Sequence, residues 1–309
     1  MAPIIEAHKL TKIYDKNKVV DNLDLKIEEG QIFGFLGPNG AGKTTTILML
    51  IGLTEPTSGS AFIAGFNSTR EPLKVKRIAG YIPENVGFYE DLSAHYNLMY
   101  TARLNGMPDS KATEAVNLAL EKVGLKDRAY DKVGTFSKGM KQRLAIADIL
   151  VKKPKVAFLD EPTSGIDPAG INQMLDLIKQ IAHENNMTIV MSSHQLNQVE
   201  RICTHVGIMS KGKMVAEGAL SQLSRKAGGG SVMIDVQLAE VTDEIVSAIR
   251  ATSGVVKVER SGDVLNITCN EDLRRQISRV IQDKGGLVTQ MKLRTLALED
   301  IYLKYFKEA

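Results

Sequence analysis

The chain has 309 residues, with 39 basic and 36 acidic side chains and a formal net charge of +3. A chain of this length can bury a large core, either in one domain or in a main domain with a smaller companion. The near balance of charge argues against a nucleic-acid partner, because such proteins concentrate Lys and Arg on one surface. We therefore expect no DNA or RNA partner.

The N-terminal residues lack the basic region and the apolar run that a secretory signal requires. The longest strongly apolar run, residues 47–53, is shorter than the roughly 20 residues that span a bilayer. We therefore expect a cytoplasmic chain whose membrane role works through a partner. Cys203 and Cys269 are far apart and have no metal-ligand spacing, so we expect both to be buried core thiols.

Over residues 1–225, short β-rich runs alternate with longer helical patterns, which predicts an α/β domain with a largely parallel sheet. Two early runs, Ile4 to Tyr14 and Asn22 to Glu28, are close enough in sequence to pair as antiparallel neighbours. The other expected elements are strands over 31–36, 155–160, 187–192 and 206–209, and a helix over 42–53.

The composition changes at residues 226–231, where a run of glycines predicts a flexible linker. Beyond the linker, the order β-α-β-β-α-β predicts a small α+β accessory domain with a ferredoxin-like arrangement, spanning residues 232–309. The expected strands are 232–238, 255–259, 264–269 and 287–293; the expected helices are 242–252, 271–282 and a final helix over 296–306.

An octapeptide between an expected strand and an expected helix fits the pattern G-x-x-x-x-G-K-S/T of a phosphate-binding loop, or P-loop. Its glycines allow consecutive N–H groups to point at phosphate oxygens, and the following helix adds its positive end. Lys43 can neutralise β- and γ-phosphate charge, and Thr44 can offer its hydroxyl to Mg²⁺. The pattern predicts binding and hydrolysis of ATP with Mg²⁺, through Gly37, Pro38, Asn39, Gly40, Ala41, Gly42, Lys43, Thr44 and Thr45.

Two further segments carry chemistry that suits a nucleotide. The apolar run 156–159 leads into Asp160, which suits the outer shell of Mg²⁺, and Glu161, which is placed to polarise a water for attack on the γ-phosphate. Ser137 stands at an expected helix N-cap and Gly139 follows it, so free N–H groups at this helix start offer a second phosphate-binding device.

In this order, the segments resemble the nucleotide-binding subunit of an ATP-binding cassette (ABC) transporter. The resemblance implies a P-loop NTPase fold with a mixed core sheet, an antiparallel β subdomain and a helical subdomain. Residues 136–140, F-S-K-G-M, stand where the family has its L-S-G-G-Q signature, which closes on ATP held by another copy. The resemblance therefore assigns Ser137, Lys138, Gly139 and Met140 to a site completed in trans.

The resemblance assigns four more positions. Tyr14 corresponds to the A-loop aromatic that stacks on adenine. Glu84, in Y-I-P-E, replaces the Q-loop glutamine and is expected to join Thr44 and Asp160 as a Mg²⁺ ligand. Asp167 belongs to the D-loop, which touches the opposite subunit in the family. His194 corresponds to the switch histidine, which contacts the γ-phosphate during catalysis.

The resemblance also implies partners. Two copies are expected to sandwich ATP and to drive a separately encoded transmembrane permease from the cytoplasmic face of the membrane. The aromatic-rich region 85–105 corresponds to the groove for the permease's coupling helix. The Y-I-P-E and F-S-K-G-M segments and the small C-terminal domain resemble subunits of ABC-2-type exporters, which include multidrug systems. An importer subunit, and a soluble ABC ATPase acting on the ribosome or on nucleic acid, stay open as alternatives.

Overall fold

The computed structural model describes residues 3–220, 222–223 and 232–294. The chain divides into two compact units, Met1–Glu217 and Gly218–Ala309. This division falls before the boundary at residue 225 that the composition suggested. The expected linker 226–231 and the expected final helix 296–306 lie outside the described residues.

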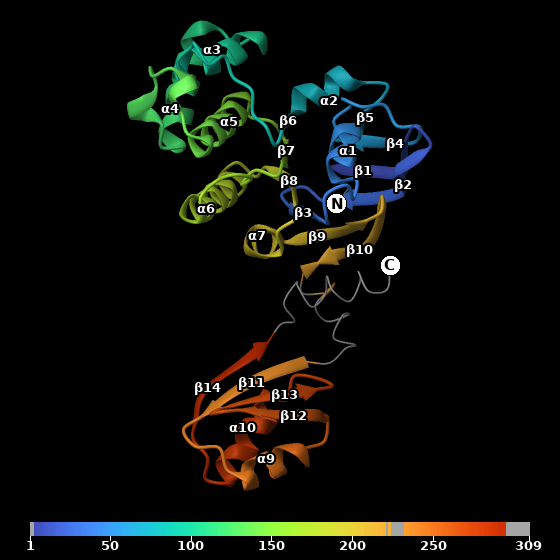
Figure 1. Cartoon of the computed structure of the whole chain (residues 1–309), viewed down its shortest axis with the longest axis vertical. Coiled ribbons are helices and arrows are strands. Elements are labelled where there is room, and N and C mark those ends of the chain that lie inside the picture. The colour runs from blue at the N-terminus through green and yellow to red at the C-terminus, as the bar shows by residue number, and fades with distance from the viewer. Residues whose placement is uncertain (1–2, 221, 224–231, 295–309) are drawn as a thin grey trace. The chain divides into compact units, whose positions relative to one another are not determined.

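The first unit is built on a six-stranded sheet with the order β10-β9-β3-β8-β7-β6 (Figure 1). β3 pairs in parallel with β8 and β9, and β7 pairs in parallel with β6 and β8. Every residue of β3 and β7 is buried, as is typical of parallel strands covered on both faces. The predicted parallel sheet is confirmed. Its strands are β3 (Ile32–Leu36), β6 (Ala79–Ile82), β7 (Val156–Asp160), β8 (Thr188–Ser193), β9 (His205–Ser210) and β10 (Lys213–Ala219).

A four-stranded antiparallel sheet with the order β2-β1-β4-β5 lies beside this core sheet (Figure 1). The predicted pairing of the first two strands is confirmed. β2 begins at Asn17, before the expected start at Asn22, because its polar first residues pair with β1 at the edge of the sheet. The sequence patterns did not predict β4, β5, β6 or β10. The strands are β1 (Ile5–Tyr14), β2 (Asn17–Ile27), β4 (Ser58–Ile63) and β5 (Phe66–Asn67).

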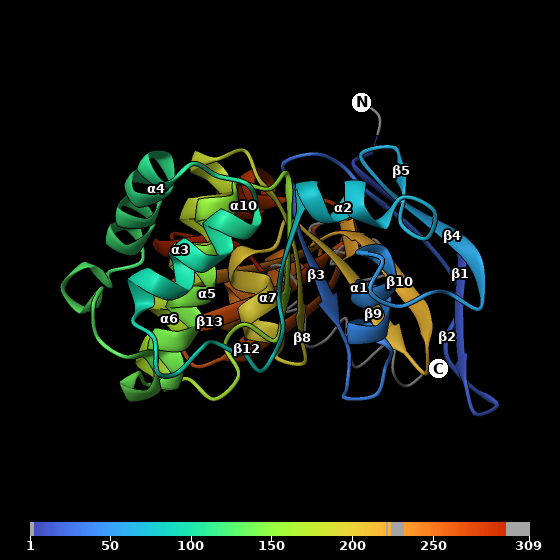
Figure 2. The same ribbon diagram turned by 90° about the horizontal axis from the view of Figure 1, so that it is seen from above.

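Helices α3, α4 and α5 form a lobe on the other side of the core sheet from β1, β2 and β4 (Figures 1 and 2). α5 begins after Ser137, whose hydroxyl accepts the Met140 N–H. α1 ends at Leu50, before the expected end at Leu53. The helices are α1 (Lys43–Leu50), α2 (Pro72–Ile78), α3 (Ala94–Leu104), α4 (Asp109–Lys122), α5 (Lys138–Lys152), α6 (Pro168–Glu184), α7 (Leu196–Ile202) and the 3-10 turns Lys126–Arg128 and Val133–Thr135.

The second unit has a four-stranded sheet with the order β12-β13-β11-β14, in which all neighbours are antiparallel. With two helices inserted between its strands, this is the ferredoxin-like arrangement that the sequence predicted. Cys269 is buried in its core and Cys203 in the first unit, as expected. The elements are β11 (Val232–Leu238), α9 (Asp243–Arg250), β12 (Val255–Ser261), β13 (Val264–Cys269), α10 (Arg274–Asp283) and β14 (Val288–Arg294).

None of the helices within the described residues is both long and apolar enough to cross a bilayer.

Deletion of residues 227 to 309 is expected to leave a folded fragment that binds ATP with nearly the affinity of the full chain. The P-loop and the strands around it belong to the first unit, which has its own hydrophobic core. Thermal unfolding with and without ATP would measure this. A fragment that unfolds cooperatively but has no affinity for ATP would contradict the division.

Candidate functional site

Two glycines shape the loop between β3 and α1. Gly42 is the N-cap of α1 and has a φ of 100°, and a Cβ there would lie 2.5 Å from the Val19 carbonyl oxygen. A Cβ at Gly37 would lie 2.4 Å from the Met209 carbonyl oxygen. Neither position tolerates a side chain. Because glycine has no Cβ, the loop can make the tight strand-to-helix turn that suits anion binding.

The carboxyl ends of β3, β8, β7 and β6 lie side by side at one edge of the core sheet. Leu36 of β3 is in register with Ser193 of β8, and Ser192 of β8 with Asp160 of β7. Segments that are far apart in the sequence therefore meet at this edge. They form a cavity of about 260 Å³, lined by Val19, Asn39, Gly40, Ala41, Gly42, Lys43, Thr44, Thr45, Glu84 and Glu161.

Lys43 is the buried cation of this cavity, with only 6 % of its surface exposed. Its Nζ donates to the carbonyl oxygens of Gly37 at 2.8 Å and Pro38 at 3.2 Å, and it lies 3.8 Å from Glu161 Oε1. Burial lowers the pKa of Lys43, although Glu161 and Asp160 act in the opposite direction. A desolvated ammonium at the start of helix α1 suits the charge of a phosphate.

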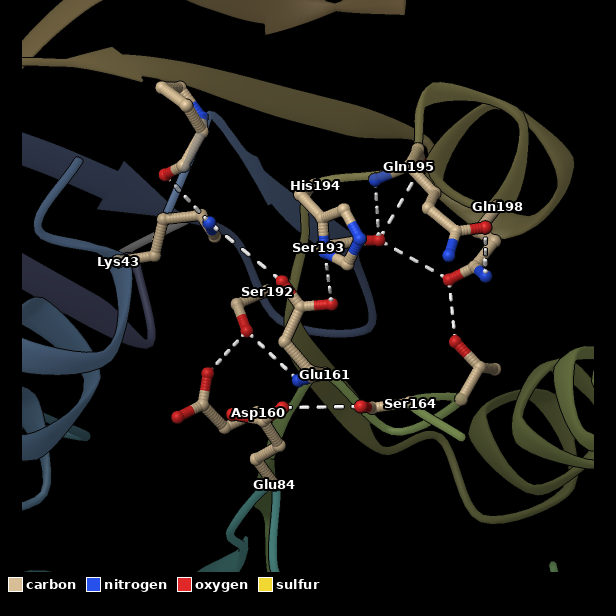
Figure 3. A network of polar contacts seen from close by, with 12 residues as sticks. Lys43, Glu84, Asp160, Glu161, Ser164, Ser192, Ser193, His194, Gln195 and Gln198 are labelled. Atoms are coloured by element: carbon tan, nitrogen blue, oxygen red, sulfur yellow. Dashed lines mark hydrogen bonds and ion pairs between the residues drawn. The ribbon is translucent and has the colours of Figure 1, made fainter. Parts of the chain in front are cut away.

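Glu161 occupies a strained position next to Lys43. Its φ is 47°, a left-handed conformation that costs about 1–2 kcal/mol for a residue with a Cβ and that clusters at functional sites. Its Oε2 lies 2.9 Å from His194 Nδ1, and an ionised carboxylate only accepts, so Nδ1 donates (Figure 3). Oε1 is buried and has no hydrogen-bond partner among the described residues, since Lys43 is too distant.

Thr44, Asp160 and Glu84 bring oxygen ligands to the same edge. Thr44 Oγ1 donates to Asp160 Oδ1 at 3.1 Å, and Ser164 Oγ donates to Glu84 Oε1 at 3.1 Å. Within the described ranges, no cluster of three or more His, Cys, Asp or Glu side chains could hold a metal alone. Mg²⁺ commonly binds one or two carboxylates together with substrate phosphates. These residues therefore fit a cation that arrives with a nucleotide.

The remaining expected residues do not line this cavity. Tyr14 is exposed at the end of β1, with the Lys12 ammonium 4.9 Å from the centre of its ring. At the start of α5, Ser137 caps the helix and Lys138 is exposed. Asp167 caps α6 by accepting the Gly170 N–H at 3.1 Å. The structure thus places these expected residues outside the P-loop cavity, at the end of β1 and at the starts of α5 and α6.

The start of α5 lies against the segment that leads into α6. A Cβ built on Gly165 would lie 2.7 Å from Lys138 Nζ, and one built on Gly139 would lie 3.7 Å from Ile166 Cγ2. The signature and D-loop segments of one chain are therefore in contact. They form a continuous surface that includes no residue of the P-loop cavity lining.

Sequence reasoning missed a set of buried hydroxyls and amides behind the acids. Ser192 Oγ donates to Asp160 Oδ1 at 2.5 Å and accepts the Glu161 N–H at 3.0 Å. Nearby, Ser193 and Thr163 both donate to Gln198 Oε1. A polar pair at the end of the apolar strand β8, just before the expected switch histidine, was the available signal.

The fold and the loop define a P-loop ATPase of the cassette type. The family model described as ABC transporter matches residues 20–164. The chain is 37% identical to the Bacitracin transport ATP-binding protein BcrA of Bacillus licheniformis, over 98% of this chain and 97% of that protein. It is also 37% identical to the Linearmycin resistance ATP-binding protein LnrL of Bacillus subtilis (strain 168), over 82% of this chain and 80% of that protein.

A solved structure described as an ATP binding subunit of an ABC transporter has a TM-score of 0.66 and 30% identity, covering 73% of this chain and 93% of that chain. The chain belongs to the ABC transporter ATP-binding family. It is the ATPase subunit of an ABC transporter, and the resemblance seen in its motifs is confirmed.

Replacing Lys43 by Met is expected to weaken ATP binding about 100-fold or more, because charge-assisted bonds to phosphate are lost from a buried site. At an ATP concentration of 100 times the wild-type Kd, the wild type gains about 2.7 kcal/mol of stability, whereas this variant should gain about 0.4 kcal/mol or less. The shift in melting temperature on adding ATP, measured for both proteins, would show the difference.

Lys152→Met is the matched control for that substitution. The Lys152 ammonium also donates to two backbone carbonyls, of Lys76 and Ala79, but outside the P-loop cavity. Its burial likewise lowers the pKa of Lys152. Equal losses of ATP affinity in both variants would contradict a specific role for Lys43.

Proposed function

We propose that this chain is the energy-coupling subunit of an ABC-2-type exporter, in which two copies bind ATP between them and drive a separate permease. The observation that carries the proposal is the P-loop cavity, where a buried cation, a strained carboxylate and oxygen ligands for a metal converge. The names of the relatives, bacitracin transport and linearmycin resistance, support export over import.

Glu161 acts as the general base in this proposal. Its Oε2 is held by His194, while Oε1 has no hydrogen-bond partner among the described residues and can accept a proton from the attacking water. Lys43 neutralises the phosphates, and Thr44, Asp160 and Glu84 would hold Mg²⁺, which would supply positive charge against the phosphate oxygens. The backbone N–H groups of the P-loop orient the nucleotide for in-line attack.

The second copy completes the site. The residues of the signature, Ser137 to Met140, lie outside the P-loop cavity of their own chain. The N-terminus of α5 is therefore a phosphate-binding device that does not line the nucleotide cavity of the same chain. We infer that these signature residues contact the γ-phosphate held by the partner copy. Asp167, beside the signature, would lie at the same interface, and Tyr14 would stack on adenine at the exposed end of β1.

Glu161→Gln is expected to lower ATP turnover by about 10²- to 10⁴-fold while ATP still binds, because the amide cannot accept the proton of water. With hydrolysis blocked, ATP should trap a dimer that size-exclusion chromatography detects. Glu114→Gln, at an exposed carboxylate of α4, is the control. Turnover at the wild-type rate in Glu161→Gln would refute the assigned base, and a monomer with bound ATP would refute the sandwich.

The permease-facing surface is proposed on α3. Tyr96, Tyr100 and Leu104 are spaced four residues apart on one face of this helix and are all exposed. Leu53, also exposed, lines a neighbouring cleft of about 240 Å³ together with Thr101 and Asn105 of α3. An exposed apolar stripe beside a cleft suits an inserted helix, and we assign it to a cytoplasmic helix of the permease.

Leu104→Glu is expected to abolish co-purification with the permease encoded in a neighbouring reading frame, because a charge would be buried in an apolar contact. The basal ATPase rate should stay unchanged, since Leu104 is outside the P-loop cavity. Leu118→Glu changes another exposed leucine, on α4, and serves as control. Retained co-purification of Leu104→Glu, or equal loss in Leu118→Glu, would place the permease elsewhere.

The rest of the organisation follows from this role. We propose that the chain works at the cytoplasmic face of the membrane, bound there through the permease. Residues 1–225 form the ATPase domain, 226–231 the linker and 232–309 the accessory domain. The first unit has its own core and contains the P-loop cavity, which supports this assignment. Charge is nearly balanced over the whole chain, which supports a protein partner over nucleic acid.

A further inference from the structure

Ser192 lies where two parallel strands bring the acidic pair to the sheet edge. It belongs to β8, is fully buried, and stands in register with Asp160 of β7. Because strands that are covered on both faces keep a strict register, the serine stays opposite the carboxylate. The position of Ser192 is therefore fixed by the core sheet.

The single hydroxyl of Ser192 serves both acids. Its Oγ donates to Asp160 Oδ1 at 2.5 Å and accepts the Glu161 N–H at 3.0 Å (Figure 3). A hydroxyl has one donor and two acceptor lone pairs, so both hydrogen bonds form together. The acceptor of the first bond is a carboxylate oxygen, and hydrogen bonds to a charged acceptor are stronger than those between neutral groups. Ser192 thus links the orientation of one carboxylate to the backbone of the other acid.

The second of these bonds acts on a strained residue. The left-handed backbone of Glu161, with φ 47°, persists only where its surroundings hold it. On one side its N–H is held by Ser192, and on the other its carbonyl accepts the Ser164 N–H at 3.0 Å. From this turn the Glu161 carboxylate reaches Lys43 and His194. Loss of Ser192 would release one side of the turn.

We propose that Ser192 is a positioning residue for ATP hydrolysis, whose buried hydroxyl holds the Asp160 carboxylate and the strained Glu161 backbone in one fixed geometry. This inference rests on the proposed function and assigns Ser192 no contact with the substrate. Without it, Asp160 Oδ1 keeps, among the described residues, only the bond from Thr44 Oγ1, at 3.1 Å, so the orientation of the carboxylate is less firmly held. A serine with a purely structural role would affect stability alone.

Ser192→Ala in the full chain is expected to lower kcat about 10- to 100-fold, with a smaller change in the KM for ATP. A second readout does not depend on turnover: the affinity for Mn²⁺ in the presence of ATP, read from the EPR signal of free Mn²⁺, should fall about tenfold. Ser192→Cys has the same shape with a somewhat larger atom and offers only a weak donor, so its losses should be intermediate. It provides the same test if the Ala variant does not fold.

Thr188→Val is the matched control. Thr188 is also fully buried on β8 and its hydroxyl accepts the Gly30 N–H at 2.9 Å, but it lies at the opposite end of the strand from the site. Its loss should lower thermal stability and leave kcat and Mn²⁺ affinity unchanged. The positioning role is wrong if folded Ser192→Ala stays within about twofold of wild type on both measures, or if Thr188→Val loses as much.

Failure of this inference is distinguishable from failure of the proposed function. An active wild type together with unaffected Ser192 variants overturns the positioning role alone. A wild-type chain that binds ATP but hydrolyses none, with or without its permease, overturns the proposed function.

Discussion

The parallel register of β3, β8, β7 and β6 is the constraint on which the rest of the structure depends. These four strands bring the P-loop, Ser192 and His194, the acidic pair, and Glu84 to one edge of the core sheet. Their buried faces leave no freedom to slip, because a shift of one residue would turn apolar side chains out of the core. The hydrophobic core thereby sets the distances between the polar groups of the site.

The site concentrates features that lower stability on their own. Lys43 is an ammonium buried beside backbone carbonyls, and Glu161 combines burial with a left-handed backbone. Such costs are tolerated where the surrounding structure holds them and where a ligand relieves them. ATP would bring negative charge to Lys43, and its metal would bring positive charge to the acidic side chains. Bound nucleotide would therefore stabilise the folded chain. A family of ATP-driven subunits can use that stabilisation to favour closure.

The signature and D-loop segments, outside the P-loop cavity, form a second group of expected site residues. The signature segment and the D-loop segment contact each other through Lys138, Gly139, Gly165 and Ile166. Glu84, in the cavity, is hydrogen-bonded to Ser164, which directly precedes that contact. In one chain, the metal side of the cavity is thus connected to the surface that we assign to the second copy. Closure of two copies and the state of each nucleotide site would be coupled through these few residues.

Local patterns in the sequence were enough to predict the elements that have a regular pattern of apolar residues or follow a strict motif. The P-loop between strand and helix, the buried runs of β3 and β7, and the ferredoxin-like order of the second unit were all predicted and confirmed. Each depends on residues close together in the chain: glycine at tight turns, continuous apolar runs for parallel strands, and serine or aspartate at helix starts. The strands β4, β5, β6 and β10 escaped prediction. β4 and β6 pair with segments distant in sequence, whereas β5 and β10 pair with the strand just before them but are short or largely polar.

The sequence by itself determined the chemistry of the protein: an ATP-binding loop, an acidic pair, a signature and a family. Only the tertiary structure decided which groups meet. The strand order puts β8 between β3 and β7, although it follows both in the chain, and this brings Ser192 opposite Asp160 and His194 against Glu161. The left-handed turn at Glu161 and the bond between Ser164 and Glu84 likewise depend on long-range pairing. No local pattern encodes them, because sheet order is set by the burial of the whole core.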